Sequence, residues 1–272
     1  MSAVIQVPTP DGISIAAYDR GRPDGRSILL IHGYSQSHLS WSRQFTGELA
    51  GRFRLAAMDL RGHGASDKPA AAEAYQDGRK WADDVAAVIE RLDLKRPVLV
   101  GWSFGGRVLC DYVRHHGQDR IGGLVYVGAA TGMNRAHAGP GRASIPDMFS
   151  DDLATNIAGT RAFLRACTAA PMPAEDYEVA LAYNMVVPAA VRRAMMARRV
   201  ENDDVLRAVR LPTLVIHGEA DTIRLPESGR HIGSLVPDAL TAFYPGVGHS
   251  PFYEASERFD ADIAAFVAFL PG

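Results

Sequence analysis

The sequence contains little cysteine, no long block of like charge and no apolar run that approaches the length of a bilayer-spanning helix. Its 272 residues include only two cysteines, Cys110 and Cys167, and neither has neighbours spaced as metal ligands. We therefore expect two buried, reduced thiols, with neither a disulfide framework nor a metal site. The N-terminal stretch MSAVIQVPTPDG lacks the basic and apolar regions of a secretory signal, which predicts a cytoplasmic protein.

Charged residues of the two signs are nearly equal in number, with 29 Lys and Arg against 31 Asp and Glu. This balance gives no reason to expect nucleic acid or an anionic membrane as partner, and it favours a small-molecule substrate. No G-x-x-x-x-G-K-[ST] stretch occurs and no G-x-G-x-x-G follows an apolar run, so no nucleotide cofactor is indicated. The basic stretch RRAMMARR, residues 192–199, could contact an acidic group, but we expect a solvated helix face there. The oligomeric state is left open.

Short apolar runs recur along the chain, and most are separated by segments of helical length. VIQV and ISIAAY flank the turn sequence PTPDG, which predicts an antiparallel hairpin at the edge of a sheet. The later runs are SILLIHG, FRLAAMDL, PVLVGWS, IGGLVYVGA, TLVIHG and LTAFYPG. In the segment 77–94, one helical stripe is formed by Trp81, Val85, Val88, Ile89 and Leu92. The pattern predicts an α/β fold, a mostly parallel twisted sheet with helices on both faces.

Residues 133–205 interrupt this alternation, because they contain several helical fragments and no convincing strand. We interpret them as a helical cap inserted into a core of residues 1–132 and 206–272. Six of the eight methionines lie in this insertion, where adaptable side chains suit a lid over an apolar pocket but also suit ordinary packing. The residues expected to line the pocket are Trp102, Met185, Met195 and Met196.

The stretch GWSFGG, residues 101–106, holds a serine between glycines where an apolar run passes into a helical pattern. Gly-x-Ser-x-Gly in this context is the nucleophile elbow, a strained turn that lifts Ser103 clear of the sheet and that small residues at 101 and 105 permit. The backbone N–H of Phe104 opens the helix without an intrahelical partner, so it can stabilise an oxyanion. The alternative is a glycine-rich turn with an incidental serine.

A serine hydroxyl needs a base and an orienting carboxylate to attack near neutral pH. Of the histidines after the serine, His249 in PGVGHSPF is the best placed, on a glycine-flanked loop between the last strand and the last helix. Glu219 and Asp221 both follow the preceding strand in TLVIHGEAD. We prefer Asp221 because it lies deeper in the loop, and Glu219 would then be a solvated turn residue. The second oxyanion donor is expected to be the backbone N–H of Tyr34, in HGYSQSHLSW.

Five stretches resemble, in order, the signature motifs of the α/β-hydrolase superfamily: LLIHGYSQSHLSW, MDLRGHGASDKP, LVGWSFGG, TLVIHGEADTI and GVGHSPFYEASERF. The resemblance covers nearly the whole chain. The chain is similar to serine esterases, cofactor-free haloperoxidases or perhydrolases, and carbon–carbon bond hydrolases that carry a helical cap. The resemblance implies that Ser103 is the nucleophile, Asp221 the acid and His249 the base. It also implies an oxyanion hole from the amides of Tyr34 and Phe104, and no cofactor.

Residues that differ from those of other superfamily members narrow the range of expected activities. Epoxide hydrolases and haloalkane dehalogenases carry aspartate at the nucleophile position, so Ser103 argues against both. Perhydrolase members often have proline and methionine where this chain has Ser35 and Phe104. Arg61 and His63, in the turn RGHGASDKP, are expected to be structural.

We therefore predict a serine hydrolase that cleaves a small, mostly apolar carboxylic ester or related acyl compound through an acyl-enzyme. The alternatives within enzymes are a carbon–carbon bond or lactone hydrolase and a perhydrolase or haloperoxidase. The alternative from another class is a small-molecule receptor on the same fold, which would turn its ligand over slowly or not at all.

Overall fold

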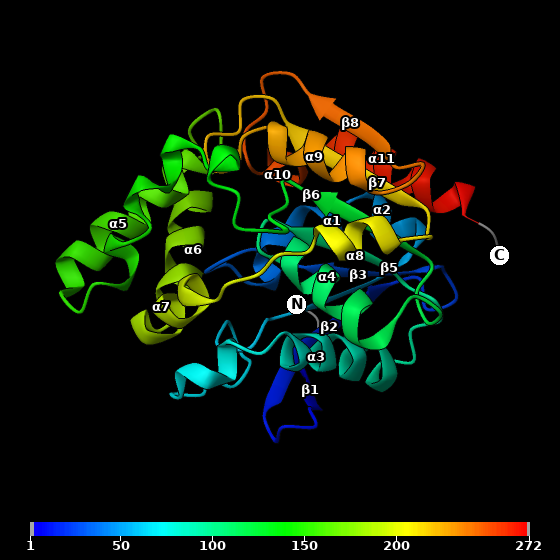
Figure 1. Cartoon of the computed structure of the whole chain (residues 1–272), viewed down its shortest axis with the longest axis horizontal. Coiled ribbons are helices and arrows are strands. Elements are labelled where there is room, and N and C mark those ends of the chain that lie inside the picture. Colours follow the sequence, from blue (N-terminus) through cyan, green and yellow to red (C-terminus); the bar gives the residue numbers. More distant parts are fainter. Residues whose placement is uncertain (1–2, 271–272) are drawn as a thin grey trace.

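The apolar runs of the sequence form the strands of one eight-stranded sheet (Figure 1). The computed structural model describes residues 3–270. The strand order is β1-β2-β4-β3-β5-β6-β7-β8; β2 is antiparallel to both of its neighbours, and all other neighbouring pairs are parallel. The strands are β1 Ile5–Pro8, β2 Ser14–Gly21, β3 Ser27–Ile31, β4 Arg54–Met58, β5 Val98–Trp102, β6 Gly123–Val127, β7 Thr213–Gly218 and β8 Leu240–Tyr244.

The N-terminal hairpin predicted from PTPDG is confirmed. Pro8 of β1 lies opposite Ser14 of β2, and the turn is closed by a 3.0 Å hydrogen bond from the Gly12 N–H to the Thr9 carbonyl. Gly12 has a φ of 86°, a conformation that glycine adopts without steric cost. In the middle of the sheet, β3, β5, β6 and β7 are buried along their whole lengths, as expected for parallel strands covered on both faces.

Helices cover both faces of the sheet, as the sequence predicts. One face packs against α3, α4, α8 and α9 in the larger apolar cluster, and the other packs against α1, α2 and α11 in the second cluster. The core helices are α1 Ser42–Thr46, α2 Glu48–Arg52, α3 Gly78–Arg91, α4 Gly105–His116, α8 Asp203–Ala208, α9 Glu227–Leu235, α10 Pro251–Glu254 and α11 Ser256–Phe269. Short 3-10 turns at His38–Trp41 and Ala72–Tyr75 complete the core.

Helix α3 illustrates how local sequence builds these elements. Its N-terminus is capped by Asp77, whose Oδ1 accepts a 2.9 Å hydrogen bond from the Arg79 N–H. All five apolar residues of the predicted stripe are buried, and the stripe packs onto the sheet within the larger cluster. The predicted helix in the segment 77–94 is therefore confirmed.

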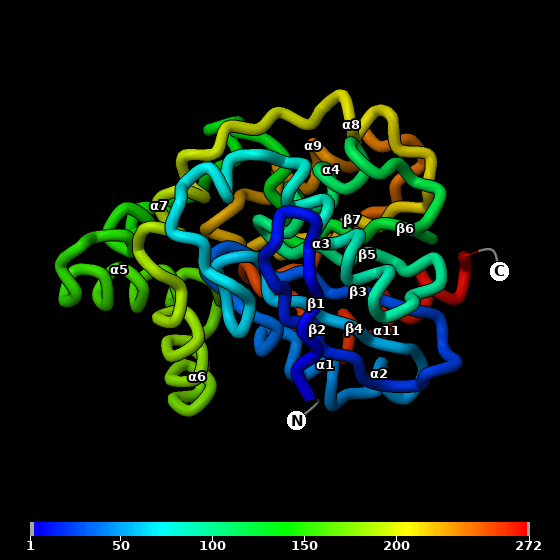
Figure 2. Tube along the Cα trace, turned by 90° about the horizontal axis from the view of Figure 1, so that it is seen from below, coloured from blue at the N-terminus to red at the C-terminus, as the bar shows by residue number. Residues whose placement is uncertain are grey.

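A helical insertion separates β6 from β7 and lies at one end of the molecule, beyond the sheet (Figures 1 and 2). It contains α5 Leu153–Ala166, α6 Ala174–Met185 and α7 Ala189–Ala197, after 3-10 turns at Arg135–His137, Pro140–Ser144 and Asp147–Phe149. We call the segment from Arg135 to Ala197 the cap. Its backbone meets the core at the isolated bridge between Ala138 and Arg224 and in neighbouring hydrogen bonds, such as that from the Gly141 N–H to the Thr222 carbonyl. The predicted limits of 133 and 205 remain an interpretation, since α8 crosses the second of them.

The expectation of a solvated face at residues 192–199 is wrong for two of its four arginines, whereas Arg193 and Arg199 are exposed. Arg192 has no exposed surface, and its guanidinium donates to the Met148 and Asn184 carbonyls and to the side chains of Asn156 and Thr160. Arg198 is also buried and pairs with Asp111 of α4 at 2.6 Å. The sequence of this stretch could not predict the burial, because it depends on oxygen atoms of distant segments that accept hydrogen bonds from the guanidinium groups.

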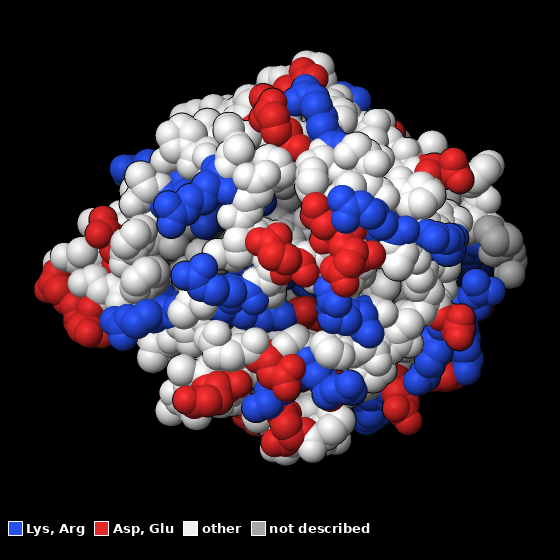
Figure 3. Space-filling model, viewed as in Figure 1, with Lys and Arg blue, Asp and Glu red and all other residues white. Residues whose placement is uncertain are grey.

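The outer surface carries both signs of charge. On the face shown in Figure 3, acidic and basic side chains are interspersed over core and cap alike. Within residues 3–270, no helix combines the length and apolar character that a membrane crossing requires.

Candidate active site

Ser103 lies between β5 and α4, at the sharp turn predicted from GWSFGG. Its φ of 53° is in the left-handed region, which is strained for a residue other than glycine. The turn needs small neighbours: a Cβ on Gly101 would lie 2.8 Å from the backbone of Gly105, and a Cβ on Gly105 would lie 2.7 Å from the Ile31 carbonyl. The Ser103 N–H donates to the Val127 carbonyl at 2.9 Å, which ties the turn to the end of β6.

Asp221 and His249 meet across 28 residues of sequence. The Asp221 Oδ2 atom lies 2.7 Å from His249 Nδ1, and both side chains are buried. The Asp221 Oδ1 atom accepts hydrogen bonds from the backbone N–H groups of Ile223 and Arg224 at 2.8 and 2.9 Å. Glu219 is exposed, so the structure brings the preferred carboxylate to the histidine.

The surroundings of Asp221 keep it ionised. Burial by itself would raise the pKa of Asp221, but the charge of His249 and hydrogen bonds from His217 and His249 outweigh burial and hold the pKa below its usual value. His217 Nε2 lies 3.2 Å from Asp221 Oδ2 and 2.8 Å from the Arg224 carbonyl. A contact between His217 and the candidate acid was not predicted from the sequence. Its position four residues before the acid, at the end of β7, was the available signal.

His249 presents its second ring nitrogen without a partner. Nε2 is buried and has no hydrogen bond to any residue within 3–270. The His249 carbonyl accepts a 2.8 Å hydrogen bond from Trp102 Nε1, and the two rings lie 5.6 Å apart. Since Trp102 directly precedes Ser103, this bond holds the histidine loop against the elbow. The Ser103 hydroxyl and His249 Nε2 are not hydrogen-bonded to one another in this structure.

The backbone N–H groups of Tyr34 and Phe104 are both free of partners among the described residues. Both residues line the same small cavity as Ser103. The loop that carries Tyr34 approaches the elbow so closely that a Cβ on Gly33 would lie 3.1 Å from the Ser103 Cβ. Two unpaired donors therefore lie beside the serine, which is the arrangement an oxyanion hole requires.

Two buried histidines hold this loop in place. The Gly33 carbonyl accepts from His32 Nδ1 at 2.8 Å, and the Ser35 N–H donates to His63 Nε2 at 3.2 Å. Burial lowers the pKa of His32 to about 4 and that of His63 to about 3, so both rings are neutral near pH 7. Ser35 itself has a φ of 62°. His63 has the structural role expected of it, whereas the role of His32 was not predicted, although the residue directly precedes Gly33.

Arg61 is structural as well. It is fully buried and donates to Asp84 at 2.7 Å and to the Ala74 carbonyl at 2.9 Å. The turn RGHGASDKP therefore braces the oxyanion loop and helix α3 without reaching the serine.

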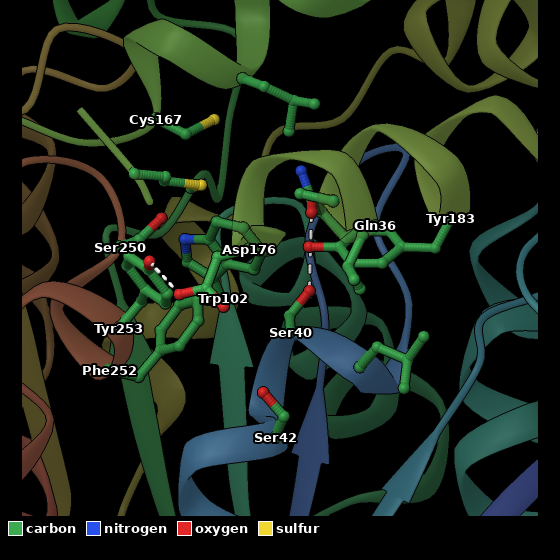
Figure 4. A pocket seen from close by; sticks show the side chains of 15 residues that line it. Gln36, Ser40, Ser42, Trp102, Cys167, Asp176, Tyr183, Ser250, Phe252 and Tyr253 are labelled. Atoms are coloured by element: carbon green, nitrogen blue, oxygen red, sulfur yellow. Dashed lines mark hydrogen bonds between the residues drawn. The ribbon is translucent and has the colours of Figure 1, made fainter. Parts of the chain in front are cut away.

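Two cavities flank the elbow. The larger, of about 260 Å³, lies between core and cap and is lined by Trp102 and Ser250, the neighbours of the serine and histidine (Figure 4). Its wall from the cap is mostly apolar, with Leu164, Met172 and Val179. At its rim the Tyr253 hydroxyl donates to Asp176 of α6 at 2.5 Å (Figure 4).

The smaller cavity, of about 20 Å³, contains the serine itself. It is lined by Tyr34, Ser103, Phe104, Arg107, Ala130, Arg142, Ile145, Phe163, Met196 and Ile223. Of the four predicted pocket residues, Met196 lines this cavity and Trp102 lines the larger one. Met185 and Met195 line neither of the two, and Met195 has no exposed surface because it packs in the apolar cluster. Met172, which was not among the predicted pocket residues, lines the larger cavity.

Within residues 3–270, no group of three His, Cys, Asp or Glu side chains is placed to hold a metal ion. Cys110 and Cys167 are buried and unpaired, as predicted.

Comparison with known proteins agrees with this geometry. The family described as alpha/beta hydrolase fold matches residues 26–256. A Burkholderia cenocepacia protein, provisionally named an aryl esterase, is 37% identical, and its crystal structure has a TM-score of 0.94 with 98% of each chain covered. An esterase of Rhodococcus sp. ECU1013 is 34% identical, with a TM-score of 0.93 and 100% of both chains covered. A bifunctional esterase/perhydrolase of Acinetobacter calcoaceticus is 29% identical over 96% of this chain and 98% of its own. The chain thus belongs to the alpha/beta hydrolase fold family.

Proposed function

We propose that the protein is a carboxylic ester hydrolase that works through an acyl-enzyme at Ser103. The observation that carries the proposal is the 2.7 Å hydrogen bond between Asp221 and His249 Nδ1, which leaves Nε2 of the same ring buried and unpartnered. A histidine oriented in this way holds its basic nitrogen ready for the proton of a serine hydroxyl.

The first half of the reaction forms the acyl-enzyme. His249 Nε2 takes the proton of the Ser103 hydroxyl as Oγ bonds to the ester carbonyl carbon, and the carbonyl oxygen gains the negative charge. The N–H groups of Tyr34 and Phe104 donate to that oxygen. When the tetrahedral intermediate collapses, the bond from carbon to the alkoxy oxygen breaks, and the protonated His249 gives its proton to the leaving alcohol.

The second half regenerates the serine. Water attacks the acyl carbon while His249 accepts one of its protons, and the bond to Ser103 Oγ breaks as the proton returns to the serine. Asp221 remains a carboxylate throughout and stabilises the histidine while the ring is charged. The larger cavity, with its apolar cap wall, supports an apolar group on one side of the ester.

The test combines turnover with chemical labelling. Wild type should show multiple turnovers on a panel of neutral esters, and Ser103→Ala should lower kcat by about four to six orders of magnitude with an unchanged thermal midpoint. An active-site phosphonate should label Ser103 in wild type, as located by peptide mass spectrometry. Labelling at Ser35 or Ser250 instead would reject the assignment. Labelling of Ser103 with a single turnover would favour a receptor over an enzyme.

A further inference from the structure

The cavity that contains Ser103 is lined by two arginines that have no acidic partner among the described residues. Arg107 comes from α4, one helical turn after the serine, and Arg142 comes from the 3-10 turn Pro140–Ser144 of the cap. Among the described residues, no carboxylate lines this cavity. Core and cap therefore each contribute one arginine to the lining of the cavity that contains Ser103.

Arg107 is buried and poorly satisfied. It is 4% exposed, and its only side-chain hydrogen bonds among the described residues are long ones, to the Gly132 carbonyl at 3.4 Å and to the Met133 sulfur at 3.3 Å. Its Nε has no partner in residues 3–270. The Arg142 guanidinium, which is half-buried, makes no hydrogen bond or ion pair anywhere in that range. A buried cation that lacks a counter-charge is unfavourable unless another group supplies one.

Other buried arginines of this protein have a carboxylate partner of the kind that Arg107 and Arg142 lack among the described residues. Arg61 pairs with Asp84 at 2.7 Å, and Arg198 pairs with Asp111 at 2.6 Å.

A third arginine without an acidic partner among the described residues, Arg224, lies near the cavity. Its Nε has no hydrogen-bond partner there, and its closest side-chain acceptor is Ser228 Oγ at 3.4 Å. Burial and the charges of Arg224 and Arg142 lower the pKa of Arg107 to about 9, so the side chain remains charged at pH 7.

Resting on the proposed function, we propose that the preferred substrate is an ester that carries a carboxylate within a few bonds of the scissile carbonyl, held by Arg107 and Arg142. A carboxylate matches the planar guanidinium and accepts two hydrogen bonds from it. One anion between these two side chains would satisfy a core residue and a cap residue together. This substrate class departs from the mostly apolar ester expected from the sequence.

The size of the cavity limits the acidic portion of the substrate. About 20 Å³ is room for one group of the size of a water molecule, so a carboxylate enters only if a lining side chain moves. Arg142 is free to move, because no hydrogen bond restrains its guanidinium. A long chain does not fit here, and the larger cavity beside Trp102 is the space for the apolar portion.

The test uses pairs of esters that differ in charge but hardly in shape. Monoethyl malonate is compared with ethyl isovalerate for a carboxylate on the acyl side, and acetoxyacetate with isobutyl acetate for one on the alcohol side. For each pair the ratio of kcat/KM, anionic over neutral, is measured for wild type and variants. Comparison of a variant with wild type cancels the intrinsic reactivity of the esters.

Arg142→Gln should lower the ratio about tenfold or more in at least one pair, the effect of one lost charge-assisted hydrogen bond. Arg142→Lys keeps the charge and should restore part of the ratio. Arg161→Gln, which removes an exposed cap arginine from α5, is the matched control and should leave both ratios at the wild-type value.

Three outcomes are distinguishable. If Arg142→Gln slows both members of each pair equally, the arginine serves the oxyanion or the fold, and the inference is wrong. Neutral esters turned over through Ser103 with unchanged ratios in every variant would also overturn it while leaving the proposed function intact. No turnover of any ester, with no label on Ser103, would instead remove the proposed function on which the inference rests.

Discussion

In the core, four strands are buried along their whole lengths between two apolar clusters, whereas the cap is centred on a charged side chain. Arg192 of α7 reaches oxygen atoms of α5, of the turn Asp147–Phe149 and of the end of α6. Apolar cap residues such as Phe163, Val187 and Met195 pack in the larger cluster. Hydrogen bonds to one buried cation additionally join the cap helices.

The residues of the candidate active site are likewise divided between core and cap. Ser103, Asp221, His249 and both oxyanion amides come from loops of the core, where backbone hydrogen bonds hold them. The cap contributes Arg142 and Met196 to the cavity at the serine, and neither side chain has a hydrogen bond that restrains it within the described part of the chain. We propose that the chemistry rests on the core and the choice of substrate on the cap, and the following substitutions test this division.

The largest effect is expected in the core, at Asp221. Asp221→Asn should lower kcat by about four orders of magnitude on a neutral ester, because the amide favours the wrong tautomer of His249. Glu219→Gln is the matched control, two residues away and exposed, and it should keep activity within about twofold of wild type. Steady-state kinetics decide the matter, and a reversal of the two results would mean that the acid is misassigned.

The next largest effect is expected in the cap, where Arg192→Met should disrupt the packing of the helices. This change leaves the Met148 and Asn184 carbonyls without their donor and should destabilise the cap by about 3–5 kcal/mol. Hydrogen exchange in α5, α6 and α7 should accelerate while that of the sheet does not, and phosphonate labelling of Ser103 should persist. Arg193→Met, at the neighbouring exposed position, is the control. Equal acceleration in β5 and β6 would show that core and cap unfold as one unit.

Substitutions of two adjacent methionines should distinguish a packing role from a substrate-contacting role. Met195→Ala should lower the free energy of unfolding by about 2–3 kcal/mol with no change in acyl-chain preference, since the side chain is fully buried in the cluster. Met196→Ala should instead shift the optimum to longer acyl chains, by about threefold to fourfold in kcat/KM per added methylene. Met185→Ala, which lines neither cavity, should leave the profile unmoved. An acyl-chain profile unmoved by Met196→Ala would mean that Met196 does not limit the acyl chain.

The smallest effect concerns the oxyanion loop and appears only in acid. Because burial lowers the pKa of His63 from 6.5 to about 3 and that of His32 to about 4, the unfolded chain binds more protons than the folded protein between pH 6.5 and 4. Stability therefore falls as the pH falls through this window. His63→Asn removes one of the two groups, so its urea midpoint should decline less steeply than that of wild type. Parallel declines would show that His63 is not held neutral.

Much of the fold was predictable from local pattern. The hairpin, the strand runs and helix α3 follow from turn residues and from the two periodicities of apolar residues, both of which act over short stretches. The elbow was predictable for the same reason, since its glycines, serine and flanking elements are contiguous. From the sequence, Asp221 could be distinguished from Glu219 as the candidate acid only in part, because both residues follow the same strand.

The sequence by itself thus determined the alternation of strands and helices, the strained turn at Ser103 and the approximate positions of the candidate acid and base. Only the tertiary structure decided that Met196 and not Met195 faces the serine, because neighbouring residues of a helix point about 100° apart. The tertiary structure likewise decided which arginines are paired. Arg198 pairs with Asp111, whereas Arg107 pairs with no acidic side chain among the described residues. Charge pairing and burial depend on which distant segments pack together, and the composition of a single stretch carries no record of that.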